Sequence, residues 1–150
     1  MVMVDISGKP QVFREATATG TIRLKPETIS LIKKEGVAKG DPFYAAKLAG
    51  ILAAKKTSTL IPLCHPLPIT NVITHVEILN NSTVQVTSTV KTNAQTGVEM
   101  EALVATAVSL LTIWDMVKKY EKDFKGQYPF TVIENIRVVK KIKEGVSSEQ

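Results

Sequence analysis

Regular alternation of apolar and polar residues predicts the first element of the fold. From Ala16 to Leu24, small or apolar residues take every second position, with threonine or arginine between them. This period of two is typical of a strand with one buried face. Two β-branched runs, Val72–Leu79 and Thr83–Thr92, are separated only by Asn80-Asn81-Ser82 and predict a hairpin.

Helical segments alternate with these strands. Proline at the start and glycine after the end delimit a short predicted helix over Pro26–Glu35. A second helix runs from Asp41 to about Lys56, and its alanines and Gly50 offer a small-residue face for close packing. The longest predicted helix covers Gly97 to about Lys122, and Phe130–Val139 is the last strand.

The order of these elements predicts the fold class. Three prolines between Leu60 and Ile69 exclude a helix there and predict a rigid, partly buried loop. The order β-α(α)-β-β-α-β is that of an α+β, ferredoxin-like split βαβ sandwich, a four-stranded antiparallel sheet with helices on one face. We expect one domain over residues 1–150, with flexible ends at about 1–12 and 145–150.

The long helix is apolar on all sides. Between Val98 and Val117 its only charged residues are Glu99, Glu101 and Asp115. Because one sheet covers only one side of a helix, we expect its outer face to pack on another subunit, and so a homo-oligomer. A membrane span is the competing interpretation, and the three carboxylates and the basic end argue against it.

Composition and charge narrow the class of protein. With 150 residues, 44% hydrophobic and 22% charged, the chain is a typical globular domain. One cysteine and no signal-peptide pattern lead us to expect a soluble cytoplasmic protein. The net charge of +5 favours an anionic partner, or only provides solubility.

Asp115 and Lys118 are the first candidates for chemistry. On a helical wheel Asp115 falls among apolar neighbours, namely Val104, Val108, Leu111 and Thr112, so we expect its carboxylate to lie in an apolar stripe. Lys118 follows at the i+3 position, within contact. The alternative is an ordinary helix ion pair. A carboxylate in apolar surroundings is costly unless it is paired or functional, which favours a functional pair.

A second group of candidate residues lies in the proline-containing loop and in the first turn of the long helix. His65 stands between Cys64 and Pro66, where rigid neighbours would aim an imidazole at little entropic cost, although it also fits a core histidine. With His75 the only other histidine, no metal site is predicted. Glu99 and Glu101 either complement the helix dipole or accept N–H groups of a guanine-like edge.

Three further cations, Arg14, Lys39 and Lys55, are either solvated charges or together a site for a triphosphate. The sequence contains no glycine-rich nucleotide-binding loop.

Six segments together resemble the cyclic pyranopterin monophosphate synthase family, molybdenum cofactor biosynthesis protein C. The resemblance runs from about Met3 to Lys141. The segments are Met3–Ser7, Lys39–Asp41, Ala49–Lys55, Leu60–Leu67, Thr96–Leu103 and Leu111–Lys118, of which Leu-Cys-His-Pro and Gly-Val-Glu-Met-Glu are the most specific.

The resemblance implies a lyase that needs no cofactor. Its substrate would be a 3′,8-cyclised dihydroguanosine triphosphate, its products cyclic pyranopterin monophosphate and pyrophosphate, and its assembly a hexamer formed as a trimer of dimers, with the pocket at the dimer interface. By the same resemblance Asp115 and Lys118 are the catalytic pair. The implied substrate-binding residues are Leu63, Cys64, His65, Met100, Glu101, Glu99, Lys39, Lys55 and Arg14.

The chain departs from the family pattern at three places. Trp114 stands where the family usually has tyrosine, the connection over Lys125–Asn135 is longer, and Lys140–Gly145 replaces a glycine-rich tail. A role for Lys141 is therefore only weakly implied.

A nucleic-acid-binding ferredoxin-like domain is the alternative. Such domains stack bases on aromatic residues of the central strands, but Ala16–Leu24 and Thr83–Thr92 contain none. We therefore expect no nucleic-acid partner.

Overall fold

The computed structural model describes residues 1–143 and 146–149. The elements are β1 (Val12–Arg23), α1 (Pro26–Lys33), α2 (Pro42–Lys55), α3 (Thr57–Leu60), β2 (Ile69–Asn80), β3 (Thr83–Ala94), α4 (Glu99–Glu121), β4 (Val132–Lys143) and β5 (Val146–Glu149).

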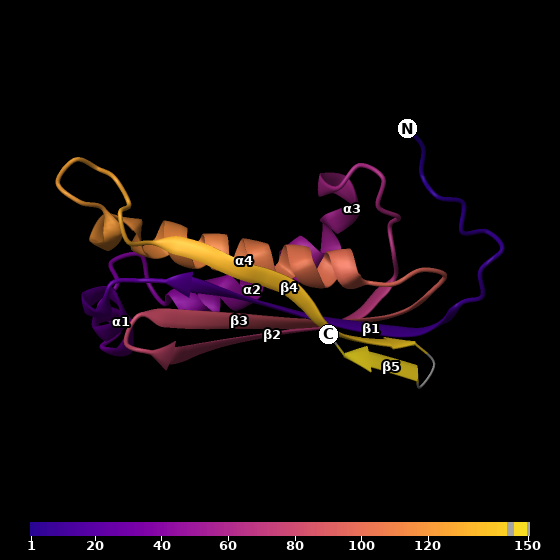
Figure 1. Cartoon of the computed structure of the whole chain (residues 1–150), viewed down its shortest axis with the longest axis horizontal. Helices are drawn as coiled ribbons and strands as arrows, with labels where there is room; N and C mark the ends of the chain where they lie inside the picture. Colours follow the sequence, from indigo (N-terminus) through magenta and orange to yellow (C-terminus); the bar gives the residue numbers. More distant parts are fainter. Residues whose placement is uncertain (144–145, 150) are drawn as a thin grey trace.

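The strands form one antiparallel sheet in the order β2-β3-β1-β4-β5. Helices α2 and α4 pack against one face of it, and α4 crosses β1 and β3 along most of their length (Figure 1). The four long strands therefore confirm the predicted α+β, ferredoxin-like arrangement. The chain end, for which no element was predicted, adds the short β5 at the β4 edge.

Several elements extend beyond their predicted bounds. Strand β1 begins four residues before Ala16, and β4 continues through Lys140 to Lys143. Their charged side chains break the alternation of apolar residues, but the backbones still pair, as Lys141 does with Ala16. The short α3 was not predicted, and its first residue Thr57 donates a hydrogen bond to the carbonyl of Ala53 at 3.0 Å.

The core lies between α4 and the sheet. One cluster gathers around Leu110, Ile113 and Val117, and a second, made of smaller residues, around Ala102 and Ala105. Helix α2 approaches α4 closely, because a Cβ at Gly50 would lie 2.5 Å from Ser109 Oγ. Glycine at this position permits the close packing that the small residues of α2 predict.

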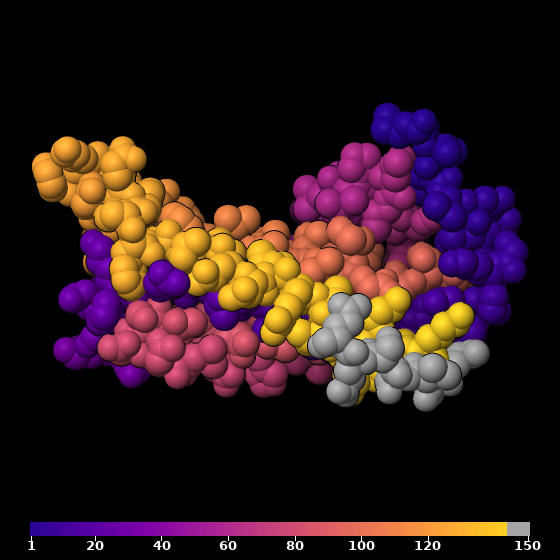
Figure 2. All heavy atoms as spheres, viewed as in Figure 1, coloured from indigo at the N-terminus to yellow at the C-terminus, as the bar shows by residue number. Residues whose placement is uncertain are grey.

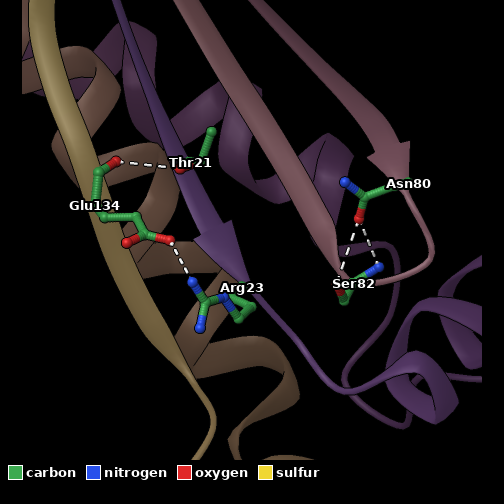
Figure 3. Close-up of polar contacts among 5 residues, drawn as sticks. All are labelled: Thr21, Arg23, Asn80, Ser82 and Glu134. Atoms are coloured by element: carbon green, nitrogen blue, oxygen red, sulfur yellow. Dashed lines mark hydrogen bonds and ion pairs between the residues drawn. The ribbon is translucent and has the colours of Figure 1, made fainter.

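Local polar contacts fix the strand ends (Figure 3). Asn80 Oδ1 accepts a hydrogen bond from the backbone N–H of Ser82 at 2.9 Å and closes the predicted hairpin. On β1, Thr21 Oγ1 donates to the carbonyl of Glu134 at 3.2 Å, and Arg23 Nη2 pairs with the Glu134 carboxylate at 3.2 Å. The register shifts here by one residue, and Asn135 takes a positive φ of 60°. The extra residue makes a β-bulge in β4, a feature that increases the local twist of a strand.

A buried carboxylate joins the end of α4 to the start of α1. Glu121 is completely buried and accepts hydrogen bonds from the hydroxyls of Thr28 and Thr131, the latter at 2.6 Å. It also accepts the backbone N–H of Lys25 at 3.1 Å. Every buried oxygen thus has a donor, which is the condition under which a buried carboxylate is tolerated.

Helix α4 is buried on one side only. By length and composition it is the one helix in the described residues that would be able to cross a membrane. Its sheet-facing side, however, forms the core, whereas Leu111 on the opposite side is 56% exposed. The helix is therefore a core helix with a second, uncovered apolar face.

Candidate functional site

Asp115 lies between two lysine ammonium groups near the end of α4. Its Oδ1 is 3.0 Å from Nζ of Lys118, one turn further along the helix. Its Oδ2 is 3.0 Å from Nζ of Lys39, which also donates to the backbone carbonyl of Asp115 at 3.0 Å. The three side chains form a compact cluster with one excess positive charge, suited to hold a phosphate oxygen.

The loop that carries Lys39 is fixed on both sides. Before it, the backbone N–H of Ala38 donates to the Tyr120 hydroxyl at 2.8 Å. After it, Gly40 adopts a φ of +116°, which favours glycine, and Asp41 caps α2 by accepting the N–H of Phe43 at 2.9 Å. The contact with Tyr120 near the end of α4 and the cap at the start of α2 thus direct the Lys39 side chain at Asp115.

Asp115 is exposed, and the predicted burial of its carboxylate is wrong. Its side chain is 57% exposed because the stripe with Val104, Val108 and Leu111 faces away from the sheet. Hydrogen bonds from Lys118 and then Lys39 lower its pKa, and Asp115 in turn raises the pKa of Lys118. In a single chain Lys118 therefore stays protonated, which suits a proton donor or a charge that stabilises an anion.

The second group borders a cavity of about 440 Å³ at the start of α4. Five of the expected substrate-binding residues line it together: Leu63, Cys64, His65, Glu99 and Met100. The first three lie in the proline-containing loop after α3, which passes close to the start of α4 (Figure 1). The structure therefore brings together segments that are more than thirty residues apart in the sequence.

Glu101 lies beneath this loop, is only 2% exposed and, unlike the five residues above, does not line the cavity. Cys64 Sγ donates to its Oε2 at 3.8 Å, whereas Oε1 is buried with no hydrogen-bond partner in the described part of the chain. Burial raises the pKa of Glu101. Burial, and then the Glu101 charge, raises the pKa of the Cys64 thiol. An unpartnered buried acceptor is costly, so this carboxyl is suited to a ligand that donates N–H groups.

The remaining expected residues divide between the two groups. Glu99 pairs with Lys141 of β4 at 2.6 Å, so the weakly implied Lys141 does reach the cavity wall. Arg14 Nε donates to the carbonyl of Ala94 at 3.1 Å and supports the loop before α4. Lys55 is exposed at the end of α2. Arg14 and Lys55 do not line the cavity, and Lys39 lies with Asp115 instead.

A single chain does not bring the Asp115 cluster near the end of α4 together with the cavity at the start of α4. Glu101 and Asp115 are 14 positions apart on a helix that is continuous from Glu99 to Glu121, which is about 21 Å along its axis. Figure 2 shows the corresponding shape, a hollow between two raised ends, one formed by the N-terminus with residues 57–65 and one by residues 122–131.

The sequence prediction missed part of the cavity wall. Val4, Ile6 and Lys9 line the same cavity as His65, although the first dozen residues were expected only to be flexible. The Met3–Ser7 segment was among those that carry the family resemblance, and this was the available signal. Residues 1–143 and 146–149 contain no cluster of three or more His, Cys, Asp or Glu side chains suited to a metal ion.

Comparison with known proteins assigns the chain to a family. The model of the MoaC family matches residues 3–144. A probable cyclic pyranopterin monophosphate synthase of Sulfolobus acidocaldarius is 59% identical over 94% of this chain and 98% of its own length. Proteins with the same name from Saccharolobus solfataricus and Thermococcus kodakarensis are 58% and 57% identical, over 95% and 94% of this chain and 95% and 90% of their own lengths. The family model matches nearly the whole chain, and these relatives are 57–59% identical to it. The chain therefore belongs to the MoaC family.

Proposed function

We propose that this protein is a cyclic pyranopterin monophosphate synthase of molybdenum cofactor biosynthesis. It converts 3′,8-cyclo-7,8-dihydroguanosine triphosphate to cyclic pyranopterin monophosphate and releases pyrophosphate. The observation that carries the proposal is the Asp115 carboxylate held between Lys39 and Lys118 in a chain of this family. The relatives bear the name of this activity.

The cluster at the end of α4 suits the phosphate half of the reaction. A sugar hydroxyl attacks the α-phosphorus, the bond from that phosphorus to the bridging oxygen breaks, and pyrophosphate leaves with the electron pair. Negative charge grows on the phosphate oxygens, and Lys39 and Lys118 are placed to stabilise it. Lys118, kept protonated by Asp115, is also a suitable proton donor.

The cavity at the start of α4 suits the ring half of the substrate. A guanine-derived ring presents N–H donors at its edge, and Glu101 Oε1 is an acceptor without a partner in the residues described, buried behind the cavity wall, where a ring edge would reach it once the Cys64 loop shifts. A charge-assisted hydrogen bond to this oxygen would remove the cost of burying it. His65 at the same cavity is available for the proton transfers of ring rearrangement.

The assay for this function follows both products. Purified protein is incubated with the cyclised nucleotide, and pyrophosphate is measured alongside the pterin product after oxidation to a fluorescent form. We expect equal amounts of both. Substrate that remains unchanged at micromolar enzyme would reject the proposed function.

We further propose that the active enzyme is a cytoplasmic hexamer, a trimer of dimers, in which each site combines groups from two copies. A nucleotide cannot span the distance of about 21 Å between Glu101 and Asp115 along one helix. The outer face of α4, with exposed Leu111, provides apolar surface for association. A neighbour's Asp115 group would then complete the cavity beside Glu101.

Mixing two inactive variants tests the shared site. We expect Asp115→Asn and Glu101→Gln to be inactive alone and to recover up to about a quarter of wild-type activity after subunit exchange. Random pairing makes about half of the dimers hybrid, and one of the two sites in each hybrid receives two intact halves. Product formation is measured before and after mixing, and exchange is verified by native mass spectrometry with one of the two variants labelled with ¹⁵N, because the two substitutions change the chain mass equally.

The matched control is a mixture of Asp115→Asn with Lys118→Ala. Both changes fall in the same half of the site, so no hybrid site is intact. Recovery in this control, or none in the first mixture despite complete exchange, would contradict the two-copy arrangement.

A further inference from the structure

The N-terminal segment forms a third wall of the ring-binding cavity. Val4, Ile6 and Lys9 line it opposite residues of the proline-containing loop and the start of α4. In Figure 2 the N-terminus lies at the same raised end as residues 57–65.

Ile6 is the point where this segment contacts the rest of the protein. Nine of the first ten residues are exposed, and Ile6 alone is half-buried. A turn directs it inward, because the backbone N–H of Lys9 donates to the carbonyl of Ile6 at 3.0 Å. The turn is fastened by Gln95, whose side-chain amide donates to the carbonyl of Lys9 at 3.1 Å.

The segment separates two cavities rather than filling the core. On its other side, Met3–Ser7 borders a second cavity of about 520 Å³, and His65 lines both. A hydrogen bond from the backbone N–H of Ser7 lowers the pKa of Asp5, and the nearby His65 lowers it slightly further. With open space on both sides, the segment contributes little to folding and is free to adjust to a ligand.

From this arrangement we propose that Val4–Lys9 belongs to the substrate-binding site, with Ile6 as a residue that contacts the substrate ring and Gln95 as the residue that positions it. The proposal rests on the proposed function and extends it to a segment with no assigned role.

The chemistry of the ligand explains why an apolar side chain is needed here. A pterin or purine ring has polar edges and apolar faces, and Glu99 at the cavity wall supplies an acceptor for an edge. A face left in water forfeits the free energy gained by burying apolar surface. Ile6, with Met100 across the cavity, offers apolar cover, and Lys9 adds a positive charge at the rim.

The test compares Ile6→Ala with Val2→Ala. Val2 is 82% exposed in the same segment and borders neither cavity, so it is a matched control. We expect Ile6→Ala to raise KM for the cyclised nucleotide about 15- to 60-fold, the loss expected for two to three buried CH₂ groups, while Tm and kcat change little. Gln95→Ala should raise KM about threefold to tenfold, and Val2→Ala should leave it unchanged.

Equal KM values for Ile6→Ala and Val2→Ala, in an active enzyme, would overturn the proposal and leave the proposed function standing. A second readout does not depend on turnover. Amide hydrogen exchange at Ile6–Lys9 is measured in Lys118→Ala with and without the cyclised nucleotide. Slower exchange on addition of the nucleotide is expected, and unchanged exchange at saturating nucleotide contradicts the proposal even if the protein catalyses nothing.

Discussion

Replacing Asp115 by asparagine, or Lys118 by alanine, is expected to lower kcat about 10³-fold, with Tm shifted by no more than about 2 °C. The neutral amide no longer holds the two ammonium groups, which would then repel each other across the site. The alanine variant removes the charge and the proton that the phosphate half of the reaction requires. Stability should barely change because the pair is exposed and contributes little to folding. Rates of pyrophosphate release, with calorimetry of the same samples, measure both effects.

Lys119→Ala is the matched control for this prediction. Lys119 is the next residue on α4, and its ammonium group lies 5.2 Å from the Tyr120 ring centroid rather than beside Asp115. Its removal should leave kcat within about twofold. Near-normal turnover in folded Asp115→Asn would show that the cluster is only a surface ion pair.

Replacing Glu121 by alanine is expected to lower the free energy of unfolding by about 3–5 kcal/mol. The substitution leaves the hydroxyls of Thr28 and Thr131 and the N–H of Lys25 buried without their acceptor, and it opens a cavity. Glu121→Gln keeps the shape but turns an amide N–H₂ toward these donors, so we expect a smaller loss of about 1–3 kcal/mol. Urea unfolding at one fixed protein concentration measures both.

Glu27→Ala separates this effect from a general loss of negative charge. Glu27 is an exposed carboxylate in the first turn of α1, close to Glu121 in the fold. Its removal should cost about 0.3–1 kcal/mol through the helix dipole. If Glu121→Ala were no more destabilising than Glu27→Ala, the buried carboxylate would not be what joins α4 to α1.

Periodicity predicted β1, β3 and α4 because each of them buries one consistent face. The alternation from Ala16 to Leu24 and the turn at Asn80-Asn81-Ser82 depend only on local sequence, and both are confirmed. The ends of β1 and β4 were missed because charged residues there continue the backbone pairing without contributing to the apolar pattern. Local pattern thus places elements well and their ends less well.

The functional site was harder to predict from sequence patterns than the fold. The wheel position of Asp115 among apolar residues was read correctly, but α4 has two apolar faces, and the wheel does not tell which one meets the sheet. Lys39 approaches Asp115 across 76 residues of sequence, and no spacing rule connects them. Both were candidates from the sequence alone, but only the family resemblance assigned them to the same site. Nor does the sequence reveal that the loop at Cys64 buries Glu101.

The position of β1 has a consequence for folding during synthesis. The first strand to be made is an inner strand of the finished sheet, with β3 on one side and β4 on the other. Its partners are distant, since Thr21 pairs with Gln85 and with Glu134. While the ribosome is still making α4, the β4-facing side of β1 has no partner, and its backbone N–H and C=O groups remain open to other nascent chains. High contact order of this kind slows folding, and the final strand must leave the ribosome before the sheet can close.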